Sequence, residues 1–129
     1  MTFPEDLKYS KEHEWVRING NIATVGITDY AQEQLGEIVF VELPGEGETL
    51  TKNDTFGVVE SVKSVSDVYA PVSGRVIEVN EPLLDSPETV NEEPYGEGWF
   101  IKVEITDHKD LNDLMTVEHY QAYIKEEAA

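Results

Sequence analysis

The sequence predicts a mainly β fold, a sandwich or barrel with short peripheral helices and a C-terminal helix. Three observations carry this prediction. The middle of the chain divides into short apolar or alternating runs, turn signals rich in Gly, Pro and Asn separate them, and helical patterns occur only near residue 30 and at the end. A length of 129 residues with 40% hydrophobic residues suits one domain, residues 1–129.

The expected strands follow one another from residue 15 to residue 105. Asn19-Gly20 predicts a tight hairpin between Trp15–Ile18 and Ile22–Val25, because both turn residues accept a positive φ. The continuously apolar run Ile38–Val41 predicts a buried strand. Further strands are expected at residues 56–59, 68–70, 75–79 and 99–105.

Two helices are expected outside this strand pattern. Thr28 or Asp29 can cap a short helix over Tyr30–Leu35, and Gly36 stands where such a helix would stop. A second, amphipathic helix should begin after residue 116. Its apolar face has the spacing i, i+3, i+7 and consists of Val117, Tyr120 and Ile124.

Charge and composition exclude several functions. The formal charge of −18 repels nucleic-acid phosphates and anionic lipids, so we expect no nucleic-acid or membrane partner and instead expect partners with basic surfaces. The chain has no Cys, which rules out disulfides, thiolate nucleophiles and Cys-based zinc sites. The first residues lack the basic and apolar regions of a secretory signal, so a cytoplasmic protein is expected.

One lysine stands out in the central acidic segment. Lys63 is the only cation between Asn53 and Gly74, and β-rich runs flank it, so we expect it at or near a hairpin tip. A lysine in such a position is most often a solvated surface charge. Without an apolar environment it is a poor nucleophile, which argues against Schiff-base chemistry and leaves acylation by a separate enzyme with an activated acyl donor.

The segment around this lysine resembles the lipoyl-attachment segment of the H-protein family of the glycine cleavage system. The resemblance rests on Val59–Lys63, Ser66-Asp67 and Ala70–Gly74. Further blocks resemble the family in the same order, so that the likeness covers roughly residues 7 to 105. These blocks are residues 7–9, 13–16, 26–31, 35–36, 39–44 and 91–99.

The resemblance implies a hybrid-barrel sandwich of the lipoyl/biotinyl type that carries lipoate in amide linkage on Lys63. Such a protein is a carrier and not a catalyst. It takes an aminomethyl group from a pyridoxal-phosphate-dependent glycine decarboxylase, presents it to a tetrahydrofolate-dependent aminomethyltransferase, and is reoxidised by dihydrolipoyl dehydrogenase. A lipoate-attaching enzyme is a further implied partner, and Glu60 and Ser61 are expected to help it recognise the hairpin.

The resemblance also implies a groove that shelters the loaded arm. Its matching positions are Glu14 and Asp67, whose carboxylates could pair with a protonated aminomethyl nitrogen. The chain departs from some relatives at two neighbouring positions, with Glu12 in place of a serine and Gln34 in place of a histidine, which changes the detailed chemistry expected there.

The expected reach of the arm, the absence of Cys and the negative charge all suit a carrier. A lipoyl-lysine arm has about eleven bonds from Cα to the dithiolane and reaches roughly 14 Å, so one carrier can visit separate active sites with its cargo held at high effective concentration. A protein thiol would exchange with the lipoyl dithiol, and this chain has none. The negative charge would steer the carrier toward basic partners.

Other functions remain open at the sequence level. A lipoyl-relay protein, which donates lipoyl groups to other carriers, would use the same lysine. A biotinyl carrier usually has Met on both sides of the lysine, where this chain has Val62 and Ser64, and a dehydrogenase lipoyl domain typically has Asp-Lys-Ala. An unmodified binding sandwich is a third class. No nucleophile–base arrangement suggests an enzyme.

No metal site is expected. Glu12-His13-Glu14 invites a metal interpretation, but successive residues of a strand point to opposite faces, so His13 could not easily join both carboxylates. The other two histidines have no ligand spacing with it.

Overall fold

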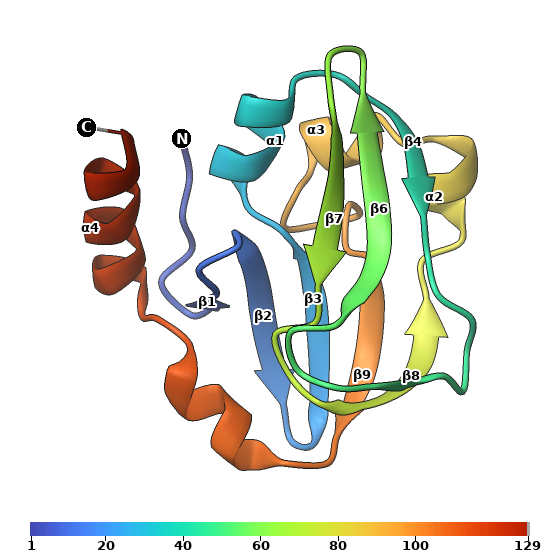
Figure 1. Ribbon diagram of the computed structural model, residues 1–129, viewed down its shortest axis with the longest axis vertical. Coiled ribbons are helices and arrows are strands. Elements are labelled where there is room, and N and C mark those ends of the chain that lie inside the picture. The colour runs from blue at the N-terminus through green and yellow to red at the C-terminus, as the bar shows by residue number, and fades with distance from the viewer. Residues whose placement is uncertain (129) are drawn as a thin grey trace.

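The computed structural model describes residues 1–128 as two antiparallel sheets with helices at their edges (Figure 1). The six-stranded sheet has the order β1-β2-β3-β9-β8-β5, and the three-stranded sheet has the order β4-β6-β7. In Figure 1, β6 and β7 lie in front of β3 and β9. The prediction of a mainly β fold with short helices and a C-terminal helix is confirmed.

The elements have the following bounds. The strands are β1 (Lys8–Tyr9), β2 (Glu14–Asn19), β3 (Ile22–Ile27), β4 (Ile38–Glu42), β5 (Thr49–Leu50), β6 (Thr55–Ser61), β7 (Val65–Tyr69), β8 (Gly74–Val79) and β9 (Ile101–Ile105). The helices are α1 (Asp29–Leu35), α2 (Pro82–Asp85), α3 (Thr89–Glu92), the 3₁₀ helix η1 (His108–Asp113) and α4 (Val117–Ala128).

The hairpin predicted around residue 19 is present, with its turn one residue later. Asn19 pairs with Ile22 across β2 and β3, so the two turn residues are Gly20 and Asn21. Gly20 has a φ of 62°, which glycine adopts without the steric penalty of a side chain. The strands predicted at 56–59, 68–70, 75–79 and 99–105 correspond to β6, β7, β8 and β9, with ends shifted by a few residues.

Both predicted helices are confirmed, with α1 beginning one residue earlier than predicted. The Oγ1 atom of Thr28 accepts a hydrogen bond from the Ala31 N–H at 3.2 Å and caps α1. Gly36 ends this helix with a φ of 85°. Helix α4 begins at Val117, and its buried face consists of Val117, Tyr120 and Ile124.

The prediction that the run 38–41 is buried throughout is wrong for its two central residues. Ile38 and Val41 are buried, but Val39 is 50% exposed and Phe40 is 47% exposed. The cause is a break in register, in which Ile38 pairs with Ser61 while Phe40 pairs with the adjacent Glu60. Such a bulge sets two residues of one strand against one of its partner, so that successive side chains no longer alternate between faces.

The main core lies between the two sheets. Inward-facing side chains of the large sheet, such as Val25 and Val103, pack with those of the small sheet, such as Val59 and Val68. Because strand side chains alternate, the opposite face of the small sheet is left to solvent.

A second apolar cluster attaches α4 to the N-terminal segment. The ring of Tyr120 stacks on Tyr9 with centroids 4.6 Å apart. Its hydroxyl oxygen lies 2.7 Å from Thr28 Oγ1 and 2.9 Å from His13 Nδ1. Burial raises the pKa of the Tyr120 hydroxyl, which therefore keeps its proton and can donate a hydrogen bond. The C-terminal helix is thus tied to the cap of α1.

Within residues 1–128, no helix is both long enough and apolar enough to cross a membrane.

Candidate functional site

Lys63 lies at the tip of the β6–β7 hairpin, as the sequence predicted, and its side chain is exposed. Ser61 shapes the turn that presents it. The Ser61 N–H donates to the Ser64 carbonyl at 2.8 Å. The Ser61 Oγ accepts from the N–H of Ser64 at 3.0 Å and from the N–H of Lys63 at 3.3 Å. One hydroxyl therefore satisfies two backbone donors of the turn.

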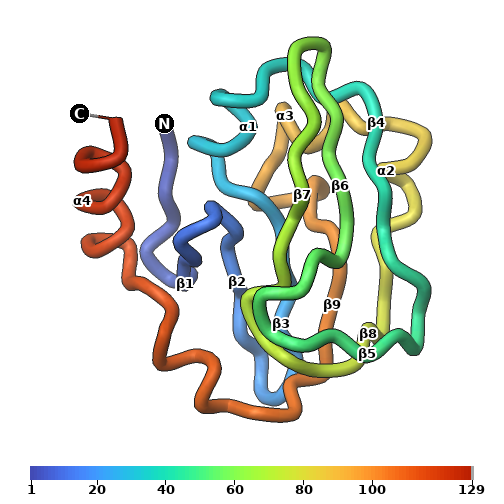
Figure 2. The backbone as a smooth tube through the Cα atoms, in the orientation of Figure 1, coloured from blue at the N-terminus to red at the C-terminus, as the bar shows by residue number. Residues whose placement is uncertain are grey.

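The segment that follows α1 also contacts the hairpin tip. The Val62 N–H donates to the Glu37 carbonyl at 3.1 Å. A Cβ on Gly36 would lie 3.3 Å from the Cε atom of Lys63, so the aliphatic stem of the lysine lies over this glycine. Figure 2 shows the hairpin projecting past α1 and β4 at one end of the molecule.

Glu14, at the start of β2, is a buried carboxylate beside β7. It is 2% exposed. Ser10 Oγ donates to its Oε1 at 2.5 Å, and the Tyr69 backbone N–H donates to its Oε2 at 3.3 Å. Burial raises the pKa of this carboxyl from 4.5 to about 7, even though both hydrogen bonds lower it. Glu14 can therefore be neutral or charged near neutral pH.

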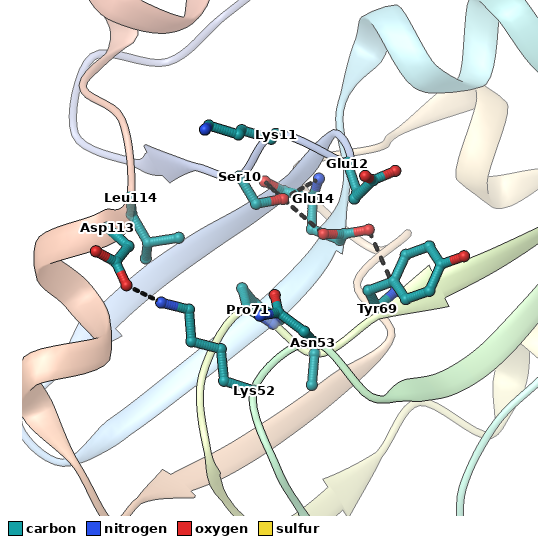
Figure 3. A pocket seen from close by; sticks show the side chains of 11 residues that line it. Ser10, Lys11, Glu12, Glu14, Lys52, Asn53, Tyr69, Pro71, Asp113 and Leu114 are labelled. Atoms are coloured by element: carbon teal, nitrogen blue, oxygen red, sulfur yellow. Dashed lines mark hydrogen bonds and ion pairs between the residues drawn. The ribbon is translucent and has the colours of Figure 1, made fainter.

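A pocket of about 380 Å³ opens in front of Glu14 (Figure 3). Lys52 lies on its opposite side, where its Nζ forms an ion pair with Asp113. That charge is already paired, and the other carboxyl and amino groups of side chains lining the pocket are those of Lys11, Glu12 and Glu14. Carboxyl groups therefore outnumber unpaired ammonium groups there and can pair with a small cation. The pocket is lined by residues 10–12, 14, 52–53, 69–71 and 113–114.

A second pocket, of about 270 Å³, shares one lining residue with the first. Glu12 lines both pockets. The second is also lined by Gln34 and Leu35 from α1 and by Ser66 from β7. Both pockets are bordered by β7, the first at Tyr69 and the second at Ser66. We call the two pockets together the β7 groove.

The structure separates the two carboxylates that the sequence analysis grouped together. Glu14 lines the groove, but Asp67 is exposed on β7, where it pairs with Val58, and it lines neither of the two pockets. Asp67 lies two residues from Tyr69, whose N–H holds Glu14. Glu12 and Gln34, the two positions that depart from some relatives, both line the second pocket.

The predicted recognition residues Glu60 and Ser61 lie next to Lys63 but differ in their surroundings. Ser61 is engaged in the turn, whereas Glu60 is partly exposed on the outer face of the small sheet. There it pairs with Phe40 on one side and Val65 on the other.

Several residues of the site have no recognisable signal in the sequence. Ser10, Tyr69 and the Lys52–Asp113 pair all shape the environment of Glu14. Tyr69 is 55 residues away from Glu14 in the chain, and no local pattern signals such a contact. Among residues 1–128, no three His, Cys, Asp or Glu side chains gather in a way that could hold a metal ion.

Comparisons with known proteins point to one family. A family model described as glycine cleavage H-protein matches residues 7–127. The glycine cleavage system H protein of Carboxydothermus hydrogenoformans is 58% identical over 124 residues, covering 96% of this chain and 95% of that protein. The protein of the same name from Anaeromyxobacter sp. is 56% identical over 127 residues, covering 98% of this chain and 99% of that protein.

A crystal structure of a glycine cleavage system H protein from Mycobacterium marinum has the same fold. It matches with a TM-score of 0.86 at 41% identity and covers 93% of this chain and 97% of that chain. The predicted hybrid-barrel architecture is thereby confirmed. With a family model spanning nearly the whole chain and relatives above half identity, the chain belongs to the glycine cleavage H-protein family.

Proposed function

We propose that Lys63 is the lipoylated residue and that this chain carries an aminomethyl group between the enzymes of glycine cleavage. Members of its family are lipoyl carriers of the glycine cleavage system and work with its other components. The observation that carries the proposal is an exposed lysine on a hydrogen-bonded turn at the tip of a hairpin, whose second strand borders a pocket that contains a buried carboxylate.

The residues present fit a lipoyl group. Lys63 is exposed and forms none of the ion pairs found within residues 1–128, so its amine is accessible for acylation. Lipoate in amide linkage there supplies a disulfide that, when opened, accepts an aminomethyl group. Gly36 leaves room for the lysine stem, because a side chain at that position would press on its Cε atom.

The β7 groove offers a place where the arm can rest. The four residue steps from Lys63 to Asp67 span about 13 Å of strand, close to the roughly 14 Å reach expected for the arm. Glu14 lies further along the same groove. We propose that Asp67, exposed on β7 within reach of the arm, and Glu14, further along the groove, attract a protonated aminomethyl nitrogen and so slow its loss as ammonia and formaldehyde.

Each partner proposed from the family resemblance has a defined task. Glycine decarboxylase loads the carrier, the aminomethyltransferase unloads it onto tetrahydrofolate, and dihydrolipoyl dehydrogenase restores the disulfide. A lipoate-attaching enzyme prepares the carrier beforehand. The charge of −18 favours encounter with basic surfaces on these partners. The chain's own residues position the arm and do not catalyse these steps.

Mass spectrometry after co-expression with a lipoate-attaching enzyme tests the attachment site. We expect a gain of about 188 Da, the mass of a lipoyl amide, on the peptide that contains Lys63. Lys63→Arg should abolish the gain, because a guanidinium does not accept the acyl group. Lys109→Arg, a change at another exposed lysine, is the matched control and should leave it intact.

Reconstitution tests the carrier role. The lipoylated chain mixed with glycine decarboxylase should exchange the glycine carboxyl group with labelled bicarbonate, and Lys63→Arg should not. An unmodified Lys63 would contradict the attachment site. A modified protein that gives no exchange, yet donates its lipoyl group to another carrier, would instead identify a lipoyl-relay protein.

A further inference from the structure

The hairpin tip is surrounded by exposed apolar side chains. Val62 is 68% exposed and Val65 is 65% exposed, and on the neighbouring β4 Val39 and Phe40 are 50% and 47% exposed. Large apolar side chains that gather on the surface mark interaction sites, whereas isolated ones need no explanation. In a chain with a charge of −18, such a gathering around the one lysine of the hairpin calls for a partner.

The strand register arranges these side chains in a row. Glu60 on β6 pairs with Phe40 on β4 and with Val65 on β7, so the row is apolar at both ends with one carboxylate in the middle. Adjacent strands lie about 4.8 Å apart, which makes the row roughly 10 Å wide. We call this row, together with Val39 and Val62, the tip face. It lies on the outer side of the small sheet and is distinct from the β7 groove.

We infer that the tip face is the surface on which the enzyme that acylates Lys63 docks. The inference rests on the proposed acylation of Lys63 and adds to it the surface that recognition requires. The partner it fits has an apolar surface with a basic residue placed to meet Glu60. Apolar contacts of this kind contribute affinity, and one charge pair within them fixes the orientation.

The short reach of the unmodified lysine side chain indicates that the partner docking here is the acylating enzyme and not an enzyme that acts on the finished arm. The acylating enzyme works on the bare amine, and Nζ lies only about 6 Å from Cα. In that step the neutral Nζ amine attacks the carbonyl carbon of the activated acyl donor and the N–C bond forms. The bond from that carbon to the activating group breaks, the activating group leaves with the electron pair, and the nitrogen gives up one proton to it or to water. The enzyme surface must therefore press against the turn, where it covers Val62 and Val65.

The enzymes that act on the finished arm are not bound by this restriction. They meet its reactive end roughly 14 Å from the Lys63 Cα, so their surfaces need not touch the row beside the lysine. Direct contact with the tip face is thus a requirement of acylation in particular.

Acylation kinetics test the inference. We expect Phe40→Thr and Val65→Thr each to lower the kcat/KM of the acylating enzyme for this chain by about tenfold, as for a central interface contact. The effect should be mainly on KM, because Nζ itself is unchanged. Binding of the unmodified chain to the enzyme, followed by calorimetry, should weaken in parallel. Both substitutions place a β-branched threonine in a strand, which favours folding.

Two controls keep the result specific. Leu84→Gln removes a comparable side chain, 52% exposed, from α2, which is not part of the tip face, and should leave acylation at the wild-type rate. Glu60→Gln keeps the shape and removes the charge, and it should slow acylation more at low salt than at high salt.

The outcomes are distinguishable. Wild-type acylation rates in both Phe40→Thr and Val65→Thr, with normal circular dichroism, would overturn the inference and leave Lys63 acylation intact. An equal loss in Leu84→Gln would also overturn it, as would tip-face variants that acylate normally but exchange glycine carboxyl groups slowly once loaded. No mass gain on the wild-type chain would overturn the proposed function itself.

Discussion

At the scale of single residues, Glu14 is the most informative group of the β7 groove. Its carboxylate is removed from water and still held by two donors, the Ser10 hydroxyl and the Tyr69 amide. Removing a charge from water favours the neutral form, and the hydrogen bonds only partly restore the charged one. A carboxylate that titrates near neutral pH can pair with a bound ammonium group when one arrives and lose its charge when none is present.

This environment predicts how stability depends on pH. The pKa of Glu14 is raised from 4.5 to about 7 in the folded protein, so between these values the folded state holds a proton that the unfolded chain has lost. The free energy of unfolding therefore falls as pH rises through this window. Glu14→Gln lacks the titration, and its stability relative to wild type should rise by on the order of 3 kcal/mol between pH 4.5 and 8.

Urea denaturation of both proteins across this pH range measures the effect. The difference between variant and wild type matters, because the other carboxyl groups titrate equally in both. Glu46→Gln, a change at an exposed carboxyl group in the loop before β5, is the control and should show no such rise. A variant whose stability follows that of wild type at every pH would contradict the raised pKa.

At the scale of elements, one hydroxyl group stabilises the turn of the β6–β7 hairpin. Ser61 Oγ accepts hydrogen bonds from the amides of both Lys63 and Ser64. This gives Ser61 a structural task in presenting the lysine. Its separate role in recognition by a lipoate-attaching enzyme stays a prediction.

Ser61→Ala should loosen the turn without unfolding the protein. The loss of one hydrogen-bond acceptor costs roughly 1 kcal/mol, so the amide protons of Lys63 and Ser64 should exchange about fivefold faster in nuclear magnetic resonance measurements. Ser66→Ala is the matched control, because the Ser66 hydroxyl donates to the Asp67 carbonyl and supports neither amide. Unchanged exchange at both positions of Ser61→Ala would show that backbone contacts alone hold the turn.

At the scale of the whole molecule, the excess of acidic residues should weaken the folded state. The chain has 27 Asp and Glu against 9 Lys and Arg. Bringing these charges together costs free energy through mutual repulsion, and dissolved ions screen it.

Added salt should therefore stabilise the protein. Raising sodium chloride from about 0.01 M to 0.15 M shortens the Debye length from roughly 30 Å to about 8 Å, and the urea midpoint should rise. The same change in salt should slow association with a basic partner, because screening also weakens steering. A midpoint that falls with salt would mean that favourable ion pairs outweigh the repulsion.

The sequence by itself determined the features that depend on near neighbours. The cap of α1 at Thr28, its end at Gly36 and the buried face of α4 follow from local hydrogen bonding and helical spacing. The position of Lys63 at a hairpin tip followed from the β-rich runs on either side of it. The resemblance to the H-protein family added the hybrid barrel, which the comparison with a solved structure confirmed.

Only the tertiary structure decided what depends on residues far apart in the chain. The run 38–41 looks buried in sequence, but a bulge fixed by pairing with β6 turns Val39 and Phe40 outward. The contact between Glu14 and Tyr69 joins segments that no periodicity relates, and burial in that contact sets the pKa of the carboxyl. Local sequence patterns predict secondary structure. The exposure of a side chain and the pKa of a buried carboxyl group depend on contacts between distant segments, so the β7 groove and the tip face could be identified only in the folded chain.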